Sequence, residues 1–485
     1  MLFLRLLATS VSLVAAARQA SQNACQYLDS TFADITVMPK DAAYSALSTE
    51  NWSATAWGKP TCVVQPRSTA DVQKIVSRLT QQRVRFAIRS GGHLPSPLGA
   101  NTNDGVLIDL STLNTKVYDA KSSTVKIGSG QKWDGVYKYL DQYNVTVVGG
   151  RVVDVGVGGL ILGSGLSYLS DLHGMACDNV VNFEIVIADG SVVNANATSN
   201  QDLFKALKGG ANNFGVVTSF TIRTYPIHDV WGGIRMYAHE QLPALYRALA
   251  TYQANDRKDP YANLMLQPFG TNQTLGAILN MVYLKPDASP AAFKPFLDVP
   301  SVADFTKFQT LYELLSAASQ PPLPRWDWHT TSFKPSRAIY EKINSIIDTA
   351  PEVTKLSKLT GGTLVLGFQP ISASLVQAGL DRGGNVLGHD KVDQTWLVLD
   401  GGWFNEKDDK KAHELVAAIM EKIEKETKKA NAYIRYQFMN DASWDQPVID
   451  HYGTNNVRFL RQVRRKYDPS MVFKKLVTGG FKLSD

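Results

Sequence analysis

The sequence Gly91-Gly92-His93 constrains the fold of this chain more than any other feature. Residues 84–88 form an apolar run, and that run ends abruptly at Ser90 and the two glycines. Glycine allows positive φ and lets a ligand approach the backbone without a Cβ in the way. Successive exposed N–H groups in such a turn form a concave anion-binding nest. Two interpretations are open here: a nest that places His93 beside an anionic cofactor, or an ordinary turn with an incidental histidine.

Further motifs follow this segment in order along the chain. They are residues 105–111 (GVLIDLS), 155–159 (VGVGG), 163–165 (GSG), 174–179 (GMACDN), 188–190 (ADG), 202–204 (DLF), 209–217 (GGANNFGVV), 452–455 (YGTN) and 466–469 (KYDP). An ordered series of this length is far more specific than one short pattern. With residues 89–93, the series closely resembles the flavin-linked oxidases of the vanillyl-alcohol oxidase/berberine-bridge-enzyme type.

This resemblance implies an α+β fold. We expect a PCMH-type FAD-binding domain, a substrate domain with an antiparallel sheet backed by helices, and a C-terminal segment that returns to the FAD domain. The expected divisions are a signal peptide (1–17), an N-terminal helical segment (18–57), the FAD-binding domain (58–228), the substrate-binding domain (229–430) and the returning segment (431–485).

The resemblance also implies that FAD is attached covalently through the imidazole of His93. The glycines of residues 155–165 are expected to cradle its pyrophosphate. They do not fit the dinucleotide-binding pattern Gly-X-Gly-X-X-Gly, because Ile161 stands three residues beyond Gly158. The other expected cofactor-binding residues are Arg89, Ser90, Gly91, Gly92, Gly150, Val155, Gly156, Gly158, Gly159, Gly163, Gly165, Ser167, Asp178, Val217 and Asn455.

Two positions of this region carry information about the reaction. Many relatives have a second covalent link, from a cysteine at the position that Val152 occupies here. Valine cannot form a thioether, so the flavin should have a single tether, which argues mildly against an oligosaccharide oxidase. Val155 occupies what resembles the oxygen-gate position of the family. A small side chain there favours an oxidase over a dehydrogenase.

A flavin performs the hydride chemistry, and the protein supplies orientation, electrostatics and a base. The candidate bases are Asp400 and Tyr436, although each is equally well interpreted as an ordinary strand residue. Burial could raise the pKa of the aspartate toward the working pH. Where relatives carry Asn-Tyr before an Asp, this chain has Met439-Asn440-Asp441, so their catalytic tyrosine does not transfer. His329 is expected either in the pocket or on a surface loop.

The N-terminus is typical of a secreted protein. Residues 1–17 carry one positive charge at Arg5, an apolar centre and three terminal alanines, as a signal peptide does. No later segment has the length of apolar sequence that a membrane span needs. A secreted or vacuolar glycoprotein is expected, with Asn-X-Ser/Thr acceptors at Asn51, Asn144, Asn196 and Asn272.

The chain has three cysteines, so an oxidising compartment leaves one of them unpaired. We expect Cys25 to pair with Cys62 and to join the N-terminal helical region to the first strand of the FAD domain. Cys177 lies in apolar sequence, where a small buried hydrophobe is its expected role. No metal site is expected, because cysteines this far apart offer no ligand spacing.

Composition excludes several functions. Among 485 residues, 44% are hydrophobic and the formal net charge is +6. The basic stretch 422–429 is interleaved with glutamates and is expected as a solvated helix face, and residues 458–466 lack interleaved aromatics. Nucleic acid is therefore not an expected partner. The expected partners are a small-molecule substrate and O2, and the expected state is a monomer.

Three functions remain open. They are a specialised-metabolite oxidase that oxidises an alcohol, closes a ring or desaturates, a carbohydrate oxidase without the second tether, and a flavin-retaining binding protein. The aromatic content of the substrate domain favours the first, although aromatics also stack on sugars. The aromatic residues concerned are Trp326, Trp328, Phe333, Phe368, Trp396, Trp403 and Phe404.

Periodicity predicts local structure within this scheme. A helix is predicted over residues 69–82, between strands at 61–64 and 85–88, and a second helix over 410–429 with one apolar face. Further strands are predicted at 105–110, 124–128, 180–188, 216–224, 264–269, 275–283, 363–370 and 395–399.

Overall fold

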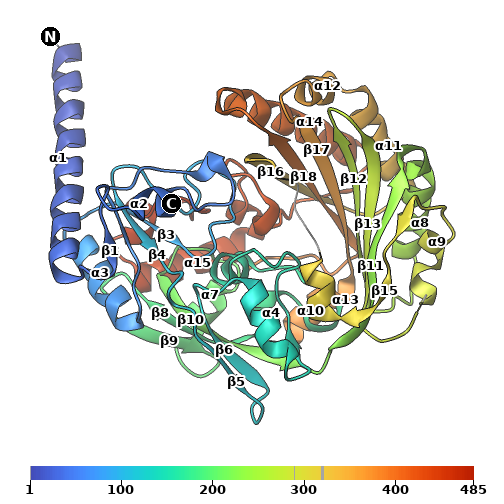
Figure 1. Ribbon diagram of the computed structural model, residues 1–485, viewed down its shortest axis with the longest axis horizontal. Helices are drawn as coiled ribbons and strands as arrows, with labels where there is room; N and C mark the ends of the chain where they lie inside the picture. Colours follow the sequence, from blue (N-terminus) through green and yellow to red (C-terminus); the bar gives the residue numbers. More distant parts are fainter. Residues whose placement is uncertain (1, 289, 318–321) are drawn as a thin grey trace.

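The computed structural model describes residues 2–288, 290–317 and 322–485. Two sheets lie in the N-terminal half of the chain and one large sheet lies in the C-terminal half (Figure 1). The first sheet has the order β1 (Thr36–Val37), β2 (Cys62–Val64), β4 (Val106–Asp109), β3 (Phe86–Arg89). Strands β2, β4 and β3 are parallel, and β1 is antiparallel to β2.

The second sheet is antiparallel. Its order is β5 (Lys116–Asp119), β6 (Thr124–Gly128), β10 (Val216–Tyr225), β8 (Val180–Val186), β9 (Val192–Asn196), and β7 (Thr146–Val147) also pairs with β10. The third sheet is antiparallel throughout. Its order is β14 (Ala303–Asp304), β11 (Asp229–Ala238), β13 (Leu275–Tyr283), β12 (Ala262–Thr271), β17 (Thr363–Ile371), β18 (Gln394–Trp403), β16 (Arg325–Phe333), β19 (Tyr433–Ile434), and β15 (Lys307–Thr310) also pairs with β11.

Helices cover the outer face of the third sheet, as Figure 1 shows. These helices are α8 (Leu242–Gln253), α9 (Lys294–Leu297), α11 (Arg337–Thr349), α12 (Pro351–Ser357) and α14 (Asp409–Lys429). Helix α14 buries Leu415, Ile419 and Ile423 at helical spacing against the sheet. The opposite face of the sheet is thereby left to line a cavity toward the N-terminal half.

The remaining helices connect the sheets and cover the N-terminal half. They are α1 (Leu2–Thr31), α2 (Tyr44–Ser48), α3 (Thr69–Gln81), α4 (Trp133–Asp141), α5 (Val157–Gly163), α6 (Ser170–His173), α7 (Gln201–Leu207), α10 (Leu311–Ser316), α13 (Ala373–Asp381), α15 (Thr454–Tyr467) and α16 (Val472–Lys475). Short 3-10 helices lie at η1 (Ala54–Ala56), η2 (Ala176–Asn179), η3 (His239–Gln241), η4 (Ala291–Phe293), η5 (Glu406–Asp408), η6 (Met439–Asp441) and η7 (Ile449–Tyr452).

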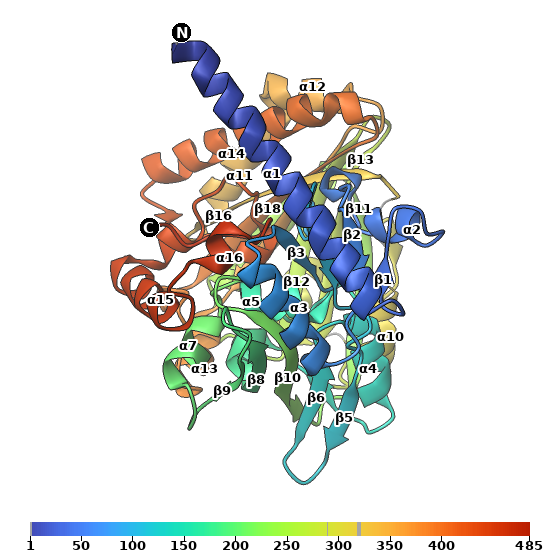
Figure 2. The same ribbon diagram turned by 90° about the vertical axis from the view of Figure 1, so that its left-hand side faces the viewer.

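The C-terminal segment returns to the N-terminal half, which confirms this part of the predicted fold. Helix α15 packs beside α7 (Figure 2). After α16, Val477 forms a parallel bridge with Phe86 of β3, and the N–H of Thr478 donates to the carbonyl oxygen of Phe86 at 2.9 Å. The end of the chain therefore packs directly against the strand that leads into Gly91-Gly92-His93.

Helix α1 includes the predicted signal sequence. Figure 1 shows its N-terminal half projecting away from the rest of the molecule. Its C-terminal half is anchored, since Ala24, Cys25 and Leu28 are buried. Cleavage at residue 17 stays a prediction, and Met1 lies outside the described residues. None of the described helices is both long and apolar enough to cross a membrane.

The predicted disulfide is confirmed. Cys25 of α1 and Cys62 of β2 are bonded, and their Cα atoms lie 5.9 Å apart. Cys177 is buried and unpaired, and its removal from water raises the pKa of its thiol. The bond therefore joins the N-terminal helix to the first parallel sheet, as the sequence predicted.

Replacing Cys62 by alanine is expected to lower the free energy of unfolding by about 2–5 kcal/mol, because the bond restricts the unfolded chain. Chemical unfolding of the two purified proteins measures the loss. The matched control is Cys177→Ala, which removes a buried thiol without removing a cross-link. An equal effect of both substitutions would contradict a stabilising role of the bond.

The four predicted glycosylation acceptors differ in accessibility. Asn51 is 3% exposed, and its side-chain amide donates to the carbonyl oxygen of Gly99 at 2.8 Å. A glycan at Asn51 is not compatible with this fold, because the atom that would carry the sugar is buried and bonded. Asn144 and Asn272 are exposed, and Asn196 is half-buried on β9. Glycosylation at these three positions stays a prediction.

Candidate active site

A cavity of about 1190 Å³ lies between the N-terminal half and the inner face of the third sheet. One wall is formed by the glycine-rich segments around residues 90–93 and 155–163. The opposite wall is formed by alternate side chains of strands β11, β12, β13, β16, β17 and β18. Two parts of the chain that are far apart in sequence therefore enclose one site.

The two glycine segments touch each other at the base of this cavity. A Cβ on Gly91 would lie 2.4 Å from the Cα of Gly156, so neither position has room for a side chain. The N–H of Gly158, in the first turn of α5, donates to Oγ of Ser90 at 3.1 Å. Ser90 in turn donates to the carbonyl oxygen of Ser129 at 2.6 Å. The two segments therefore pack backbone against backbone where they cross, which the absence of a Cβ at both glycines permits.

His93 lines the cavity beside this crossing. The ring of Trp52 stacks on its imidazole, with centroids 4.4 Å apart and 8° between the planes. The Nε2 atom of His93 is buried and has no hydrogen-bond partner among the described residues. Burial and, to a smaller extent, the positive charge of Lys132 lower the pKa of His93 to about 4. The imidazole is therefore neutral, and its Nε2 is a buried nitrogen without a hydrogen-bond partner among the described residues.

This geometry fits a bound flavin. At Gly159, beside this crossing, no atom lies within 4 Å of the place where a Cβ would stand, so the backbone leaves an open cradle there, and Nε2 of His93 is a buried polar atom without a partner among the described residues. Unpaired buried polar atoms are rare in folded proteins, and each one needs an explanation. A group that occupies the cradle and bonds to His93 would explain both features.

Most of the predicted cofactor residues lie at this cavity. The residues that line it are Ser90, Gly91, Gly92, His93, Val155, Gly156, Gly158, Gly159, Gly163 and Val217. The predicted residues outside its lining are Arg89, Gly150, Gly165, Ser167, Asp178 and Asn455.

The structure gives the residues outside the lining other roles. The Arg89 guanidinium is buried and forms an ion pair with Asp109, so it fixes the start of the turn. Oγ of Ser167 accepts the N–H of Leu169 at 3.3 Å. Asn455 is exposed in the first turn of α15.

The two glycines and Asp178 are also structural. A Cβ on Gly150 would lie 2.7 Å from the Trp133 ring, and Gly165 has φ +75°. Asp178 accepts the N–H of Met175 and the side-chain amide of Asn385, both at 2.9 Å. These residues shape the turns on either side of α5.

The two candidate bases are separated by the structure. Asp400 of β18 lines the cavity and is paired in register with Trp328 of β16. The Trp328 ring lies 5.7 Å from that of His93. Tyr436 is not part of the lining. It is 3% exposed and packs against Trp396 in the core, so the structure does not support it as a base.

The environment of Asp400 favours its neutral form. Its removal from bulk water raises the pKa of Asp400 well above the ordinary value, and the negative charge of Asp441 raises it further. The Arg151 guanidinium acts in the opposite direction and lowers it. Within the described residues, no side chain forms a hydrogen bond with the Asp400 carboxylate. Its oxygens are therefore available to a ligand in the cavity.

A chain of polar contacts beside Asp400 was not predicted. Nη2 of Arg151 donates to Oε1 of Gln369, and Nε2 of Gln369 donates to Oδ2 of Asp441 at 2.8 Å. Asn440 holds the adjacent glycine turn, because its Oδ1 accepts the N–H of Gly165 at 3.0 Å. The only sign of this cluster in the sequence was that residues 439–441 differ from the corresponding residues of relatives.

The aromatic residues of the substrate domain differ in their distance from the cavity. Trp326 and Trp328 line the cavity. The others lie elsewhere: Phe333, Phe368, Trp396 and Trp403 are buried in the protein core, and Phe404 is 56% exposed.

His329 lies neither in the pocket nor on a surface loop. It is 4% exposed on β16 and faces α14, on the side of the strand opposite to Trp328. Both alternatives drawn from the sequence were therefore wrong, because alternate residues of a strand point to opposite faces.

The fold and the cavity define a class of flavin-binding protein with a separate substrate sheet, and comparisons with known proteins agree. Residues 60–196 match the FAD binding domain family. The chain is 37% identical over 468 residues to an FAD-dependent monooxygenase of Arthrobotrys oligospora, covering 94% of this chain and 89% of the relative. It is 35% identical over 471 residues to the bifunctional solanapyrone synthase of Alternaria solani, covering 95% and 89%.

Solved structures share the fold at lower identity. 6-Hydroxy-D-nicotine oxidase from Arthrobacter nicotinovorans aligns with a TM-score of 0.77 at 20% identity, over 93% of this chain and 97% of that one. Xylooligosaccharide oxidase from Myceliophthora thermophila aligns with a TM-score of 0.76 at 17% identity, over 97% and 100%. The chain belongs to the FAD-dependent oxidoreductases of the vanillyl-alcohol oxidase/berberine-bridge-enzyme-like family.

Proposed function

We propose that this protein is an FAD-dependent oxidase of a small, largely apolar metabolite, with the flavin attached to His93 and Asp400 as the base. The observation that carries the proposal is that one cavity is lined both by His93, whose Nε2 has no hydrogen-bond partner among the described residues, and by Asp400. FAD, when bound, accepts a hydride from the substrate and passes the electrons to O2, which leaves as H2O2.

The residues of this chain would bind and deprotonate the substrate. Asp400 takes the hydroxyl or amine proton as the C–H bond breaks, because its carboxylate lines the cavity and has no side-chain hydrogen-bond partner among the described residues. Trp328 pairs in register with Asp400, and its ring lies 5.7 Å from that of His93, so it limits where a substrate can lie. Arg151 donates a hydrogen bond to Gln369, and Gln369 donates one to Asp441. Asp441 is therefore held by the protein, and Asp400 remains the group that accepts the substrate's proton.

The wall of the cavity favours an apolar substrate over an oligosaccharide. Among its side chains, Gln267 and Asn280 bond to each other at 2.7 Å, and Gln369 is engaged by Arg151 and Asp441. These three amide side chains are thus engaged by protein partners. The apolar residues of this wall are Ile234, Met236, Met265, Phe269, Ile278, Val365 and Val398. One relative is named as a bifunctional solanapyrone synthase.

Val152 and Val155 both line the cavity. The valine at position 152 supports a single tether, because it has no thiol to bond with the flavin. Val155 directly precedes Gly156, at the crossing of the two glycine segments. A small side chain there would leave a path for O2 toward the bound flavin.

Enlarging this side chain, Val155→Leu, is expected to slow reoxidation of the reduced enzyme by O2 by roughly tenfold, equivalent to about 1.4 kcal/mol in the barrier. Anaerobic reduction by substrate should stay nearly unchanged, since the substrate approaches from the sheet. Stopped-flow absorbance measures the two half-reactions separately. Loss of both together would indicate general damage and contradict a gate.

The proposed function is tested by a peroxide-release screen on purified holoprotein. Alcohols, aromatic polyketide-like compounds and oligosaccharides are supplied in parallel, with oxygen or an artificial electron acceptor. Peroxide from an apolar alcohol or polyketide supports the proposal. Turnover of oligosaccharides alone would establish the carbohydrate oxidase instead, and turnover only with the artificial acceptor would establish a dehydrogenase.

A further inference from the structure

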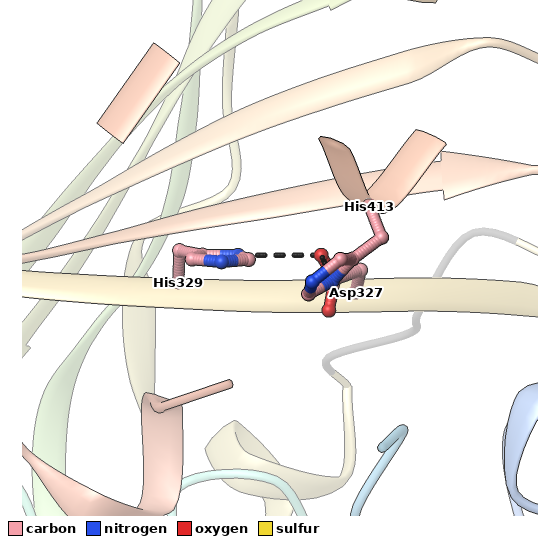
Figure 3. A group of neighbouring side chains, drawn as sticks. All are labelled: Asp327, His329 and His413. Atoms are coloured by element: carbon pink, nitrogen blue, oxygen red, sulfur yellow. Dashed lines mark hydrogen bonds and ion pairs between the residues drawn. The ribbon is translucent and has the colours of Figure 1, made fainter. Parts of the chain in front are cut away.

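Two histidines and two aspartates meet on the side of β16 that faces away from the cavity. Asp327 and His329 are alternate residues of β16 and therefore share one face. His413 reaches them from α14, and Asp445 follows η6. Figure 3 shows the side chains of Asp327, His329 and His413 directed toward one another. None of these residues takes part in the proposed flavin chemistry.

The facing atoms are spaced like the ligands of a metal ion. Oδ2 of Asp327 lies 3.0 Å from Nδ1 of His413 and 3.2 Å from Nδ1 of His329. The three residues can offer ligand atoms that all lie within 4.8 Å of one another. In a tetrahedral zinc site, bonds of about 2.0–2.2 Å place neighbouring ligand atoms about 3.3–3.5 Å apart. Small side-chain shifts would bring the three atoms to those distances.

Asp445 occupies the position of an outer carboxylate. Its Oδ2 lies 3.1 Å from Nε2 of His413, and its Oδ1 lies 3.7 Å from Nε2 of His329. Histidines that bind a metal through one nitrogen almost always donate the other N–H to a carboxylate, carbonyl or water. One aspartate therefore faces the Nδ1 atoms of both rings, and the other aspartate faces both Nε2 atoms.

An ion-pair network is the alternative explanation for this cluster. A protonated His413 would donate Nδ1–H to Asp327 and Nε2–H to Asp445, and these hydrogen bonds raise the pKa of His413 to about 10. A metal ion would have to displace that proton. The network accounts less well for His329, whose side chain is 5% exposed: its Nδ1 lies 3.2 Å from Oδ2 of Asp327 but forms no hydrogen bond among the described residues.

We propose that Asp327, His329 and His413 bind one divalent transition-metal ion, with Zn²⁺ as the preferred ion and Asp445 as the outer carboxylate. Imidazole nitrogen with a carboxylate oxygen is a donor set that suits zinc. The ion would connect β16, α14 and the segment after η6. Because Trp326 and Trp328 extend from the other face of β16 into the cavity, the ion would also hold the wall that faces His93.

The test is zinc binding to tag-free holoprotein that has been dialysed against a chelator. Calorimetric titration with Zn²⁺ should give one equivalent per chain, and added Zn²⁺ should raise the melting temperature. His329→Ala and His413→Gln should each weaken binding by at least about 100-fold, and Asp445→Asn by about 10–100-fold. The matched control is His228→Gln, because His228 also lies between two aspartates, Asp141 and Asp229, but has no second histidine beside it.

Each outcome either supports or overturns the proposed zinc site. One equivalent of Zn²⁺ that is lost in both histidine variants and retained in His228→Gln supports it. No binding at one equivalent, or equal binding by all variants, overturns it in favour of the ion-pair network. If a variant fails to fold, the Co²⁺ form of the unaltered protein decides instead. The intense visible absorption of tetrahedral cobalt supports the site, and its absence contradicts the site.

Discussion

Replacing Asp400 by asparagine is expected to slow anaerobic reduction of the flavin by substrate roughly 10²–10⁴-fold, the usual contribution of a positioned base. The amide keeps the shape of the side chain but cannot take a proton. In the unaltered protein, reduction should speed up as pH rises through the pKa of Asp400, because only the carboxylate accepts a proton. This pKa is raised by burial, so the rise should lie above the range of an exposed aspartate. The rise should be absent in Asp400→Asn.

Two control variants separate the base from its surroundings. Asp441→Asn removes the neighbouring charge that helps to raise the pKa of Asp400. The rise of the reduction rate with pH should therefore occur at lower pH. Tyr436→Phe changes a core residue and should leave the rate of reduction within a few-fold of the original. A large loss in Tyr436→Phe, with little change in Asp400→Asn, would reverse the assignment.

Replacing His93 by alanine is expected to abolish covalent flavin. After acid precipitation, the unaltered protein should stay yellow, while the His93→Ala protein should release its flavin to the supernatant. The physical reason is that His93 presents the unpartnered buried Nε2 at the cradle. Absorbance of the pellet and the supernatant measures both fractions.

Trp52→Leu is the matched control for this experiment. It removes the ring that stacks on His93 at 4.4 Å but keeps the imidazole, so the flavin should remain attached. Flavin that stays bound to the His93→Ala pellet would show that another residue forms the link. Flavin released from the unaltered protein would show that there is no covalent link.

The sequence predicted much of the fold because the relevant patterns are local. The apolar spacing in residues 69–82 and 410–429 predicted helices that match α3 and α14 to within a residue. The glycines at 91 and 156 were predicted to approach a ligand. The structure adds that they touch each other, which no local pattern could reveal.

The sequence failed where side-chain direction depends on the partner strand. Residues 325–329 alternate strictly between polar and aromatic side chains, a pattern typical of a strand, yet no strand was predicted there. Register then places Trp328 in the cavity and His329 against α14. The contacts of Arg151 with Gln369 and of Gln369 with Asp441 join three distant segments, and only the folded chain shows them.

The most direct test of the account is the amount of peroxide released per O2 consumed during turnover, measured with isotopically labelled oxygen gas. The proposed oxidase removes a hydride and releases both oxygen atoms as peroxide. We expect one H2O2 for each O2 and no labelled oxygen in the organic product. Labelled oxygen in the product, with a matching deficit of peroxide, would contradict the account and indicate a monooxygenase, the activity for which the relative from Arthrobotrys oligospora is named.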